Sequence, residues 1–162
     1  RAAAAHRGAA LVEIYQNCPI FNDDAFLAIK DRDSQQARLV HLVDGQPVAV
    51  GTEESRQLLV RDLAGHIGFV PQADADPTRV VVHDASAADP GQAFAISRLD
   101  SAEMAHVPMG IFRNVSRPTY DDAVRAQVTG AVAASGGPAD DAALDALLLG
   151  GDTWTVGDTD ME

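Results

Sequence analysis

Residues 9–22, AALVEIYQNCPIFN, restrict the possible folds of this chain more than any other segment. The first half, Ala9–Tyr15, is apolar and rich in β-prone residues apart from Glu13, which is typical of a strand buried on both faces of a parallel sheet. A polar turn containing Cys18 follows at the carboxyl end of this strand, where open α/β sheets bind their ligands. The sequence therefore predicts an α/β fold with its chemistry at Cys18.

The segment before this strand predicts that further sequence precedes it. Residues 1–8, RAAAAHRG, have the pattern of the last turns of a helix that Gly8 terminates. A buried parallel strand needs neighbouring strands and covering helices, and few candidates for them follow in the chain. We therefore expect most of that sheet to lie before Arg1, which would make this chain the C-terminal piece of a larger subunit.

The remainder of the chain predicts a mixed α+β region. Residues 52–65 fit either a helix or a strand, and residues 152–162 place the Trp in a short apolar patch before an acidic end. The predicted elements are a short helix at 24–31, a polar loop at 31–36, a hairpin of strands 37–43 and 46–51 around Asp44-Gly45, short strands at 65–71 and 79–84, and helices at 90–100, 118–135 and 138–149. If residues 52–65 form a strand, it covers 57–62.

The charge of the chain limits its partners. There are 24 acidic against 12 basic side chains, which gives a formal net charge of -12. Such a surface repels phosphate backbones, so we expect no nucleic-acid binding, and it suits a partner with a basic face. One cysteine cannot form an internal disulfide, which fits a reducing cytoplasm. No segment has the pattern of a membrane span or a signal peptide.

Three interpretations of Cys18 follow from the residues alone. It is a buried structural cysteine, or a nucleophile with His6 or His41 as its base, or a metal ligand. A thiolate followed by proline in a turn is typical of the cysteine that iron–sulfur proteins supply at a distance from a CxxC pair. A four-iron cluster needs four thiolates, so the other three would lie outside this chain. A cysteine hydrolase and a non-catalytic subunit-interaction module remain as alternatives.

Glu13 and the histidines give weaker signals. A charge inside a buried strand requires a partner, so Glu13 forms a salt bridge with a segment outside the chain or contacts a cofactor. The histidines show no zinc-binding spacing. We expect His6 to lie at a helix end. We expect His41 and His83 to be partly buried structural residues in strands, and His66 and His106 to lie in loops.

The run AHRGAALVEIYQNCPIFND, residues 5–23, resembles the end of the thiamine-pyrophosphate domain in the β subunit of 2-oxoacid:ferredoxin oxidoreductases. The later stretches VVVHDAS, PGQAFAISRLD, MGIFRNVSRPTYDD and GDTWTV resemble the C-terminal region of the same subunit, and the similarity is greatest to the 2-oxoglutarate-type enzymes of actinobacteria. The family pattern is a His-Lys/Arg-Gly, a hydrophobic strand, a cysteine turn and Phe-Asn. Here these are His6-Arg7-Gly8, Ala9–Tyr15, Asn17-Cys18-Pro19 and Phe21-Asn22.

This resemblance implies a fold and a reaction. Residues 1–30 would be the last helix–strand unit of a thiamine-pyrophosphate-binding fold, and residues 31–162 would be the C-terminal region of the β subunit. The enzyme would decarboxylate a 2-oxoacid, 2-oxoglutarate in the matching subtype, and form acyl-coenzyme A. Electrons would pass through a [4Fe–4S] cluster to ferredoxin, and an α subunit would be the partner.

The resemblance also assigns the cofactor ligands. Cys18 would be the fourth ligand of the cluster. The other three cysteines, and the Gly-Asp-Gly motif that holds the diphosphate and Mg²⁺, lie before Arg1 in that family. We therefore expect the chain to be inactive alone.

Overall fold

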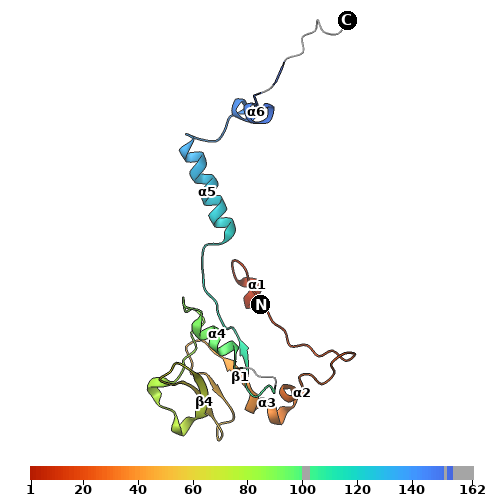
Figure 1. Cartoon of the computed structure of the whole chain (residues 1–162), viewed down its shortest axis with the longest axis vertical. Coiled ribbons are helices and arrows are strands. Elements are labelled where there is room, and N and C mark those ends of the chain that lie inside the picture. The colour runs from red at the N-terminus through yellow and green to blue at the C-terminus, as the bar shows by residue number, and fades with distance from the viewer. Residues whose placement is uncertain (100–102, 152, 155–162) are drawn as a thin grey trace. The chain divides into compact units, whose positions relative to one another are not determined.

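The computed structural model describes residues 1–99, 103–151 and 153–154, so most of the predicted acidic end lies outside the described residues. The chain divides into two compact units, Arg1–Arg117 and Pro118–Glu162. The domain boundary at residue 30 that the family resemblance implies stays a prediction. The elements, drawn in Figure 1, are α1 (Ala2–Ala5), α2 (Leu27–Lys30), α3 (Arg32–Arg38), β1 (Leu39–Leu42), β2 (Ala49–Val50), β3 (Gln57–Arg61), β4 (Ile67–Pro71), the 3-10 turns η1 (Gln72–Asp74) and η2 (Pro77–Arg79), α4 (Gly91–Ser97), β5 (Val107–Gly110), α5 (Tyr120–Ala134) and α6 (Asp141–Leu149).

Two small sheets form the centre of the first unit. Strands β1 and β5 pair in parallel, and β2, β3 and β4 form an antiparallel sheet in that order. The predicted mixed α/β architecture is confirmed, as is the strand at 65–71. Of the two interpretations left open for residues 52–65, the strand is the one that forms, and it pairs with 65–71 as β3–β4. None of the helices in the described residues is long and apolar enough to cross a membrane.

The core lies between these sheets and α4. Alternate residues of a strand point to the same face, so β1 buries Val40 and Leu42 and exposes His41 between them. Helix α4 adds Ile96. Because aromatic residues make up only 5% of the chain, the core is aliphatic. Its buried members are Val40, Leu42, Val48, Val50, Leu59, Val81 and Ile96.

The hairpin predicted around Asp44-Gly45 is wrong. These two residues do form a turn, but β1 pairs with β5 and β2 pairs with β3. The backbone groups of the turn and of the residues after it pair with the segment around residues 81–83 instead. Gly45 N–H donates to the His83 carbonyl at 2.8 Å, and Val48 N–H donates to the Val81 carbonyl at 2.9 Å. The strand predicted at 79–84 accordingly makes isolated bridges rather than a ladder.

The polar loop predicted at 31–36 is also wrong, because residues 32–36 belong to α3 and Asp31 precedes it as the cap. The carboxylate of Asp31 accepts a hydrogen bond from Ser34 N–H at 3.1 Å and caps the helix. The longer predicted helices are confirmed as α4, α5 and α6. Helix α5 begins with a capping box between Thr119 and Asp122, and Gly137 N–H donates to the Val132 carbonyl at its end.

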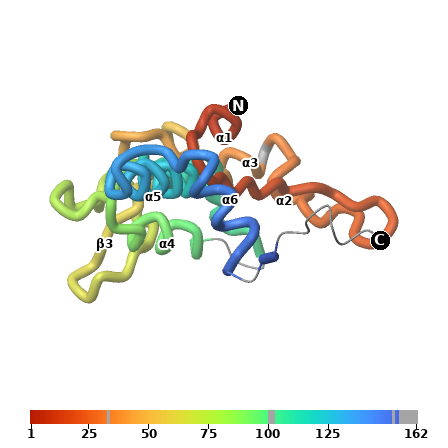
Figure 2. Tube along the Cα trace, turned by 90° about the horizontal axis from the view of Figure 1, so that it is seen from above, coloured from red at the N-terminus to blue at the C-terminus, as the bar shows by residue number. Residues whose placement is uncertain are grey.

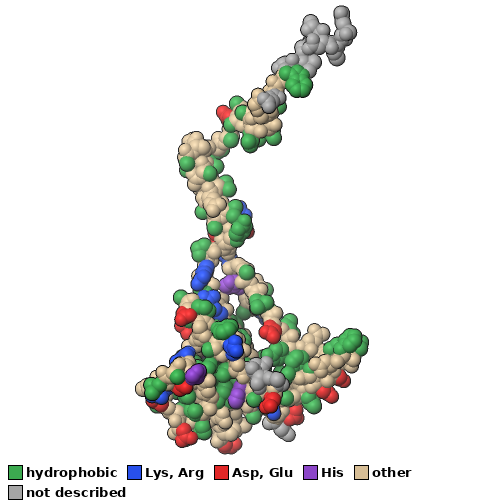
Figure 3. Space-filling view, viewed as in Figure 1, with side chains coloured by type: hydrophobic (Ala, Val, Ile, Leu, Met, Phe, Trp, Pro, Cys, Tyr) green, Lys and Arg blue, Asp and Glu red, His purple; other side chains and the backbone are tan. Residues whose placement is uncertain are grey.

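The buried strand predicted at Ala9–Tyr15 is not formed. Residues 9–17 are in no strand, Leu11 is 98% exposed and Glu13 is exposed as well. A strand needs a hydrogen-bonded neighbour, and the described chain places none beside this segment. Figures 1 and 2 show residues 9–22 as an extended path that turns back before α2, and Figure 3 shows apolar side chains on the surface where it turns.

A glycine allows the close approach of the parallel strands. Gly110 ends β5 with φ of 138°, and a Cβ atom built there would lie 2.9 Å from the Leu42 carbonyl oxygen. We expect Gly110→Ala to destabilise the protein by about 1–3 kcal/mol, since strain at such a φ adds to the overlap. Urea denaturation measures this free energy of unfolding.

The matched control for that variant is Gly68→Ala in β4. A Cβ atom at Gly68 meets no atom within 4 Å, and its φ lies outside the left-handed region. A stability loss as large as that of Gly110→Ala would contradict the role given to Gly110.

Candidate functional site

The segment from Tyr15 to Phe26 is a closed loop. At its base the aromatic rings of these two residues stack, with centroids 5.1 Å apart and an interplanar angle of 4°. Nearer the tip, the side-chain amide of Asn17 donates to the carboxylate of Asp23. Asp23 thereby holds the two sides of this loop together.

Cys18 lies near the tip of the loop. Asn22 N–H donates to the Cys18 carbonyl at 2.9 Å, so the two residues form an isolated bridge. Backbone N–H groups of Phe21, and to a lesser extent of Ile20 and Asn22, hydrogen-bond the sulfur and lower the pKa of the Cys18 thiol, against the opposing effect of burial. Donors around the sulfur favour the thiolate, which is the form that binds metals.

The loop fits one ligand position of an iron–sulfur cluster. Such clusters are held by cysteine thiolates, and hydrogen bonds to the sulfurs are among the features that set their potential. Cys18 is partly buried rather than enclosed. In the described part of the chain, no three His, Cys, Asp or Glu side chains are grouped to hold a metal ion. An iron–sulfur cluster bound here would therefore take one thiolate from this chain, that of Cys18.

The two candidate bases for a cysteine nucleophile lie elsewhere. The Nδ1 atom of His6 is 2.9 Å from the Asn114 Oδ1 atom, and His41 is exposed on β1, against the expectation that it is partly buried. Among the described residues, no hydrogen bond joins a histidine to Cys18. The geometry therefore does not favour the cysteine hydrolase.

The other histidines have structural contacts. His83 is 2% exposed and its Nε2 atom lies 2.8 Å from the Ile111 carbonyl, which agrees with the structural role predicted for it. His66 lies 3.2 Å from an exposed carboxylate four residues earlier. The ring of His106 packs on Phe69 with centroids 4.5 Å apart, and burial is the main cause that lowers the pKa of His106.

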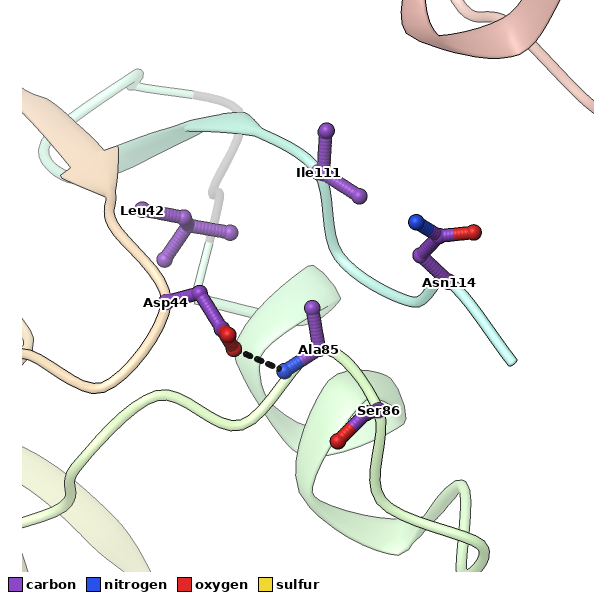
Figure 4. Close-up of a pocket in the computed structure, with 6 residues that line it drawn as sticks. All are labelled: Leu42, Asp44, Ala85, Ser86, Ile111 and Asn114. Carbon is purple, nitrogen blue, oxygen red and sulfur yellow. Dashed lines mark hydrogen bonds between the residues drawn. The ribbon is translucent and has the colours of Figure 1, made fainter. Parts of the chain in front are cut away.

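A cavity of about 200 Å³ is a second candidate, which the sequence reasoning missed (Figure 4). It lies at the carboxyl ends of β1 and β5, because parallel strands bring these ends to one edge of their sheet. The only signal in the sequence was the acidic turn after β1. Its lining residues are Leu42, Asp44, Ala85, Ser86, Ile111 and Asn114.

The polar groups of this cavity already bond within the chain. The Asp44 carboxylate accepts from Ala85 N–H at 2.8 Å, as the dashed line in Figure 4 shows. The Ser86 hydroxyl donates to the Asp84 carboxylate at 2.8 Å. These bonds hold the loops at the sheet edge, and we assign no reaction to the cavity.

Comparison with known proteins gives one relative that matches nearly the whole chain. The chain is 46% identical over 156 residues to the 2-oxoglutarate oxidoreductase subunit KorB of Mycobacterium tuberculosis. The alignment covers 96% of this chain and 40% of that subunit, so the chain spans less than half the length of this relative. No protein-family model matches the chain, and no solved structure matches it. The resemblance to a 2-oxoglutarate-type oxidoreductase subunit is confirmed.

Proposed function

We propose that this chain, related in sequence to KorB, is part of the β subunit of a 2-oxoacid:ferredoxin oxidoreductase acting on 2-oxoglutarate. The whole enzyme would convert 2-oxoglutarate and coenzyme A into an acyl-coenzyme A and carbon dioxide, with two electrons passed to ferredoxin. An α subunit would complete the assembly.

The observation that carries this proposal is the thiol of Cys18, surrounded by backbone N–H donors in a closed loop. A loop closed at its base by stacked rings holds its tip in a defined conformation, as a cluster ligand requires. The sequence identity to KorB extends over nearly the whole chain. A chance match limited to the short cysteine turn would not produce an alignment of that length.

Three residues of the loop have defined tasks in this proposal. When bound, thiamine pyrophosphate with Mg²⁺ supplies the electron sink for decarboxylation, and a [4Fe–4S] cluster supplies the path for the electrons. Cys18 would hold one iron as the fourth ligand. The N–H groups of Phe21 and Ile20 would stabilise negative charge on its sulfur and so favour the reduced cluster.

The exposed apolar segment before the loop supports the thiamine-pyrophosphate-binding fold. Leu11, Val12 and Ile14 are 98%, 59% and 77% exposed, which is costly for side chains of this size. Strand neighbours from the rest of the β subunit would cover them and pair with the backbone of this segment. In that arrangement residues 9–15 become the predicted strand, and Cys18 follows its carboxyl end.

The test is an anaerobic assay of the full-length β subunit purified with its α subunit. With thiamine pyrophosphate, Mg²⁺ and coenzyme A present, we expect 2-oxoglutarate to reduce ferredoxin at least about tenfold faster than pyruvate does, because a site built for a second carboxylate rejects a substrate that lacks it. Formation of the acyl-coenzyme A is measured in parallel. An enzyme that contains all cofactors and reduces ferredoxin with no 2-oxoacid would refute the proposal.

A further inference from the structure

The second unit exposes apolar helical surface. On α5, Tyr120, Val124, Val128 and Val132 follow one another at intervals of four residues and therefore lie along one side of the helix. Val128 is 58% exposed and Tyr120 84% exposed. Figure 3 shows apolar side chains at the surface of α5 and α6. The large exposed residues of α6 are Leu144, Leu147, Leu148 and Leu149.

Both helices are well specified by local signals although no described residue of either is buried. The capping box begins α5, and the Asp140 carboxylate accepts from Ala143 N–H at 2.8 Å to begin α6. A helix that is apolar around most of its circumference, as α6 is, is normally covered by other protein. Exposed apolar surface rimmed by polar residues marks an interaction site.

The negative charge near this surface indicates what kind of partner would bind it. Residues 118–151 hold five acidic side chains against one basic residue, Arg125. In the described part of the chain, Asp121, Asp141 and Asp145 enter no ion pair. Opposite potentials across an interface favour association, so the complementary surface is an apolar groove bordered by Lys and Arg.

The same charge disfavours three other occupants. A second copy of this chain would bring two strongly acidic surfaces together, which costs free energy. Anionic membranes attract basic amphipathic helices and repel acidic ones. Nucleic acid is repelled for the same reason.

We propose that residues 120–149 are the docking element by which the β subunit binds its α subunit, with the apolar sides of α5 and α6 inserted in a groove bordered by basic residues. This is a helix-in-groove interface, in which apolar residues at intervals of three and four serve as anchors. The identity of the partner rests on the proposed function, whereas the docking surface rests on the exposure and charge of the two helices.

The experiment compares binding of the purified α subunit by full-length β subunits that differ at one surface position. Val128→Asp and Leu147→Asp each place a charge on the apolar surface, and Ala126→Asp places the same charge on the opposite side of α5. We expect the first two to raise the Kd at least about tenfold and Ala126→Asp to change it less than about twofold. Higher salt should weaken binding by the unmodified protein.

Several results would overturn the docking proposal. The first is an equal affinity of Val128→Asp and Ala126→Asp for the α subunit. The second is self-association of the unmodified protein that Val128→Asp abolishes. The third is binding of the unmodified protein to anionic lipid vesicles that Val128→Asp abolishes. Circular dichroism verifies that each variant keeps its helices. If Val128→Asp weakens the complex while the unmodified complex oxidises no 2-oxoacid, the proposed function fails and the docking surface stands. If the complex is active and both variants bind normally, the docking surface fails and the function stands.

Discussion

Cys18→Ser is expected to remove the [4Fe–4S] cluster from the assembled enzyme. A serine hydroxyl replaces the thiolate poorly, and it leaves the N–H groups of Phe21 and Ile20 directed at a group that is not a metal ligand. Ferredoxin reduction should fall at least about a hundredfold, since losses outside the ligand set alone cost about 10–100-fold. Iron content and visible absorbance are measured with the activity. Binding of thiamine pyrophosphate should be retained, because the proposal assigns no ligand for it to Cys18.

The matched control is Ile20→Ser, which introduces the same hydroxyl two residues away. The side chain of Ile20 is 84% exposed, and its backbone N–H is unchanged by the substitution. We expect this variant to keep its iron and its activity. A Cys18→Ser enzyme with unchanged iron content and unchanged ferredoxin reduction would show that Cys18 is a structural cysteine.

Elements defined by neighbouring residues could be predicted from the sequence. Helix α5 has a capping box at one end and glycines at the other, and both signals act within a few residues. The β3–β4 pair is also local, because a short turn joins its strands, but the sequence left the first of them open between helix and strand. The polar helix α3 was missed because it lacks an apolar stripe, and its main signal is the single cap at Asp31.

Pairing between distant segments could not be predicted in this way. The turn at Asp44-Gly45 looked like a hairpin, but the hydrogen-bonding positions after it are taken by the segment around Val81. The partner of β1 is β5, which lies more than sixty residues later in the chain. Periodicity shows which face of a strand is buried and not which segment lies beside it.

Of the candidate site, the sequence predicted one residue, Cys18. The turn chemistry around Cys18 was visible in the sequence, and the structure adds the closing contacts of Tyr15 with Phe26 and of Asn17 with Asp23. These contacts join residues that carry no pattern of their own. Glu13 was expected inside a sheet and is exposed, because its segment has no strand neighbour among the described residues.

Leu59→Ala is expected to cause a large loss of stability in the first unit. Leu59 is fully buried at the centre of β3. Its N–H donates to the Val48 carbonyl and its carbonyl accepts from Val81 N–H, so it lies between two other core segments. Removing a buried leucine side chain costs about 2–5 kcal/mol, because burial is lost and the neighbours do not fill the cavity.

Leu63→Ala is the matched control for that substitution, since it removes the same atoms from a side chain that is 89% exposed in the turn between β3 and β4. Its free energy of unfolding should stay within about 0.5 kcal/mol of the unmodified protein. Urea denaturation of both variants gives the difference directly. The backbone hydrogen bonds of residue 59 are kept in Leu59→Ala and still join β3 to both neighbouring segments, so the variant should lower the midpoint without splitting the transition. Equal midpoints for the two variants would show that the aliphatic cluster around β3 is not what stabilises this unit.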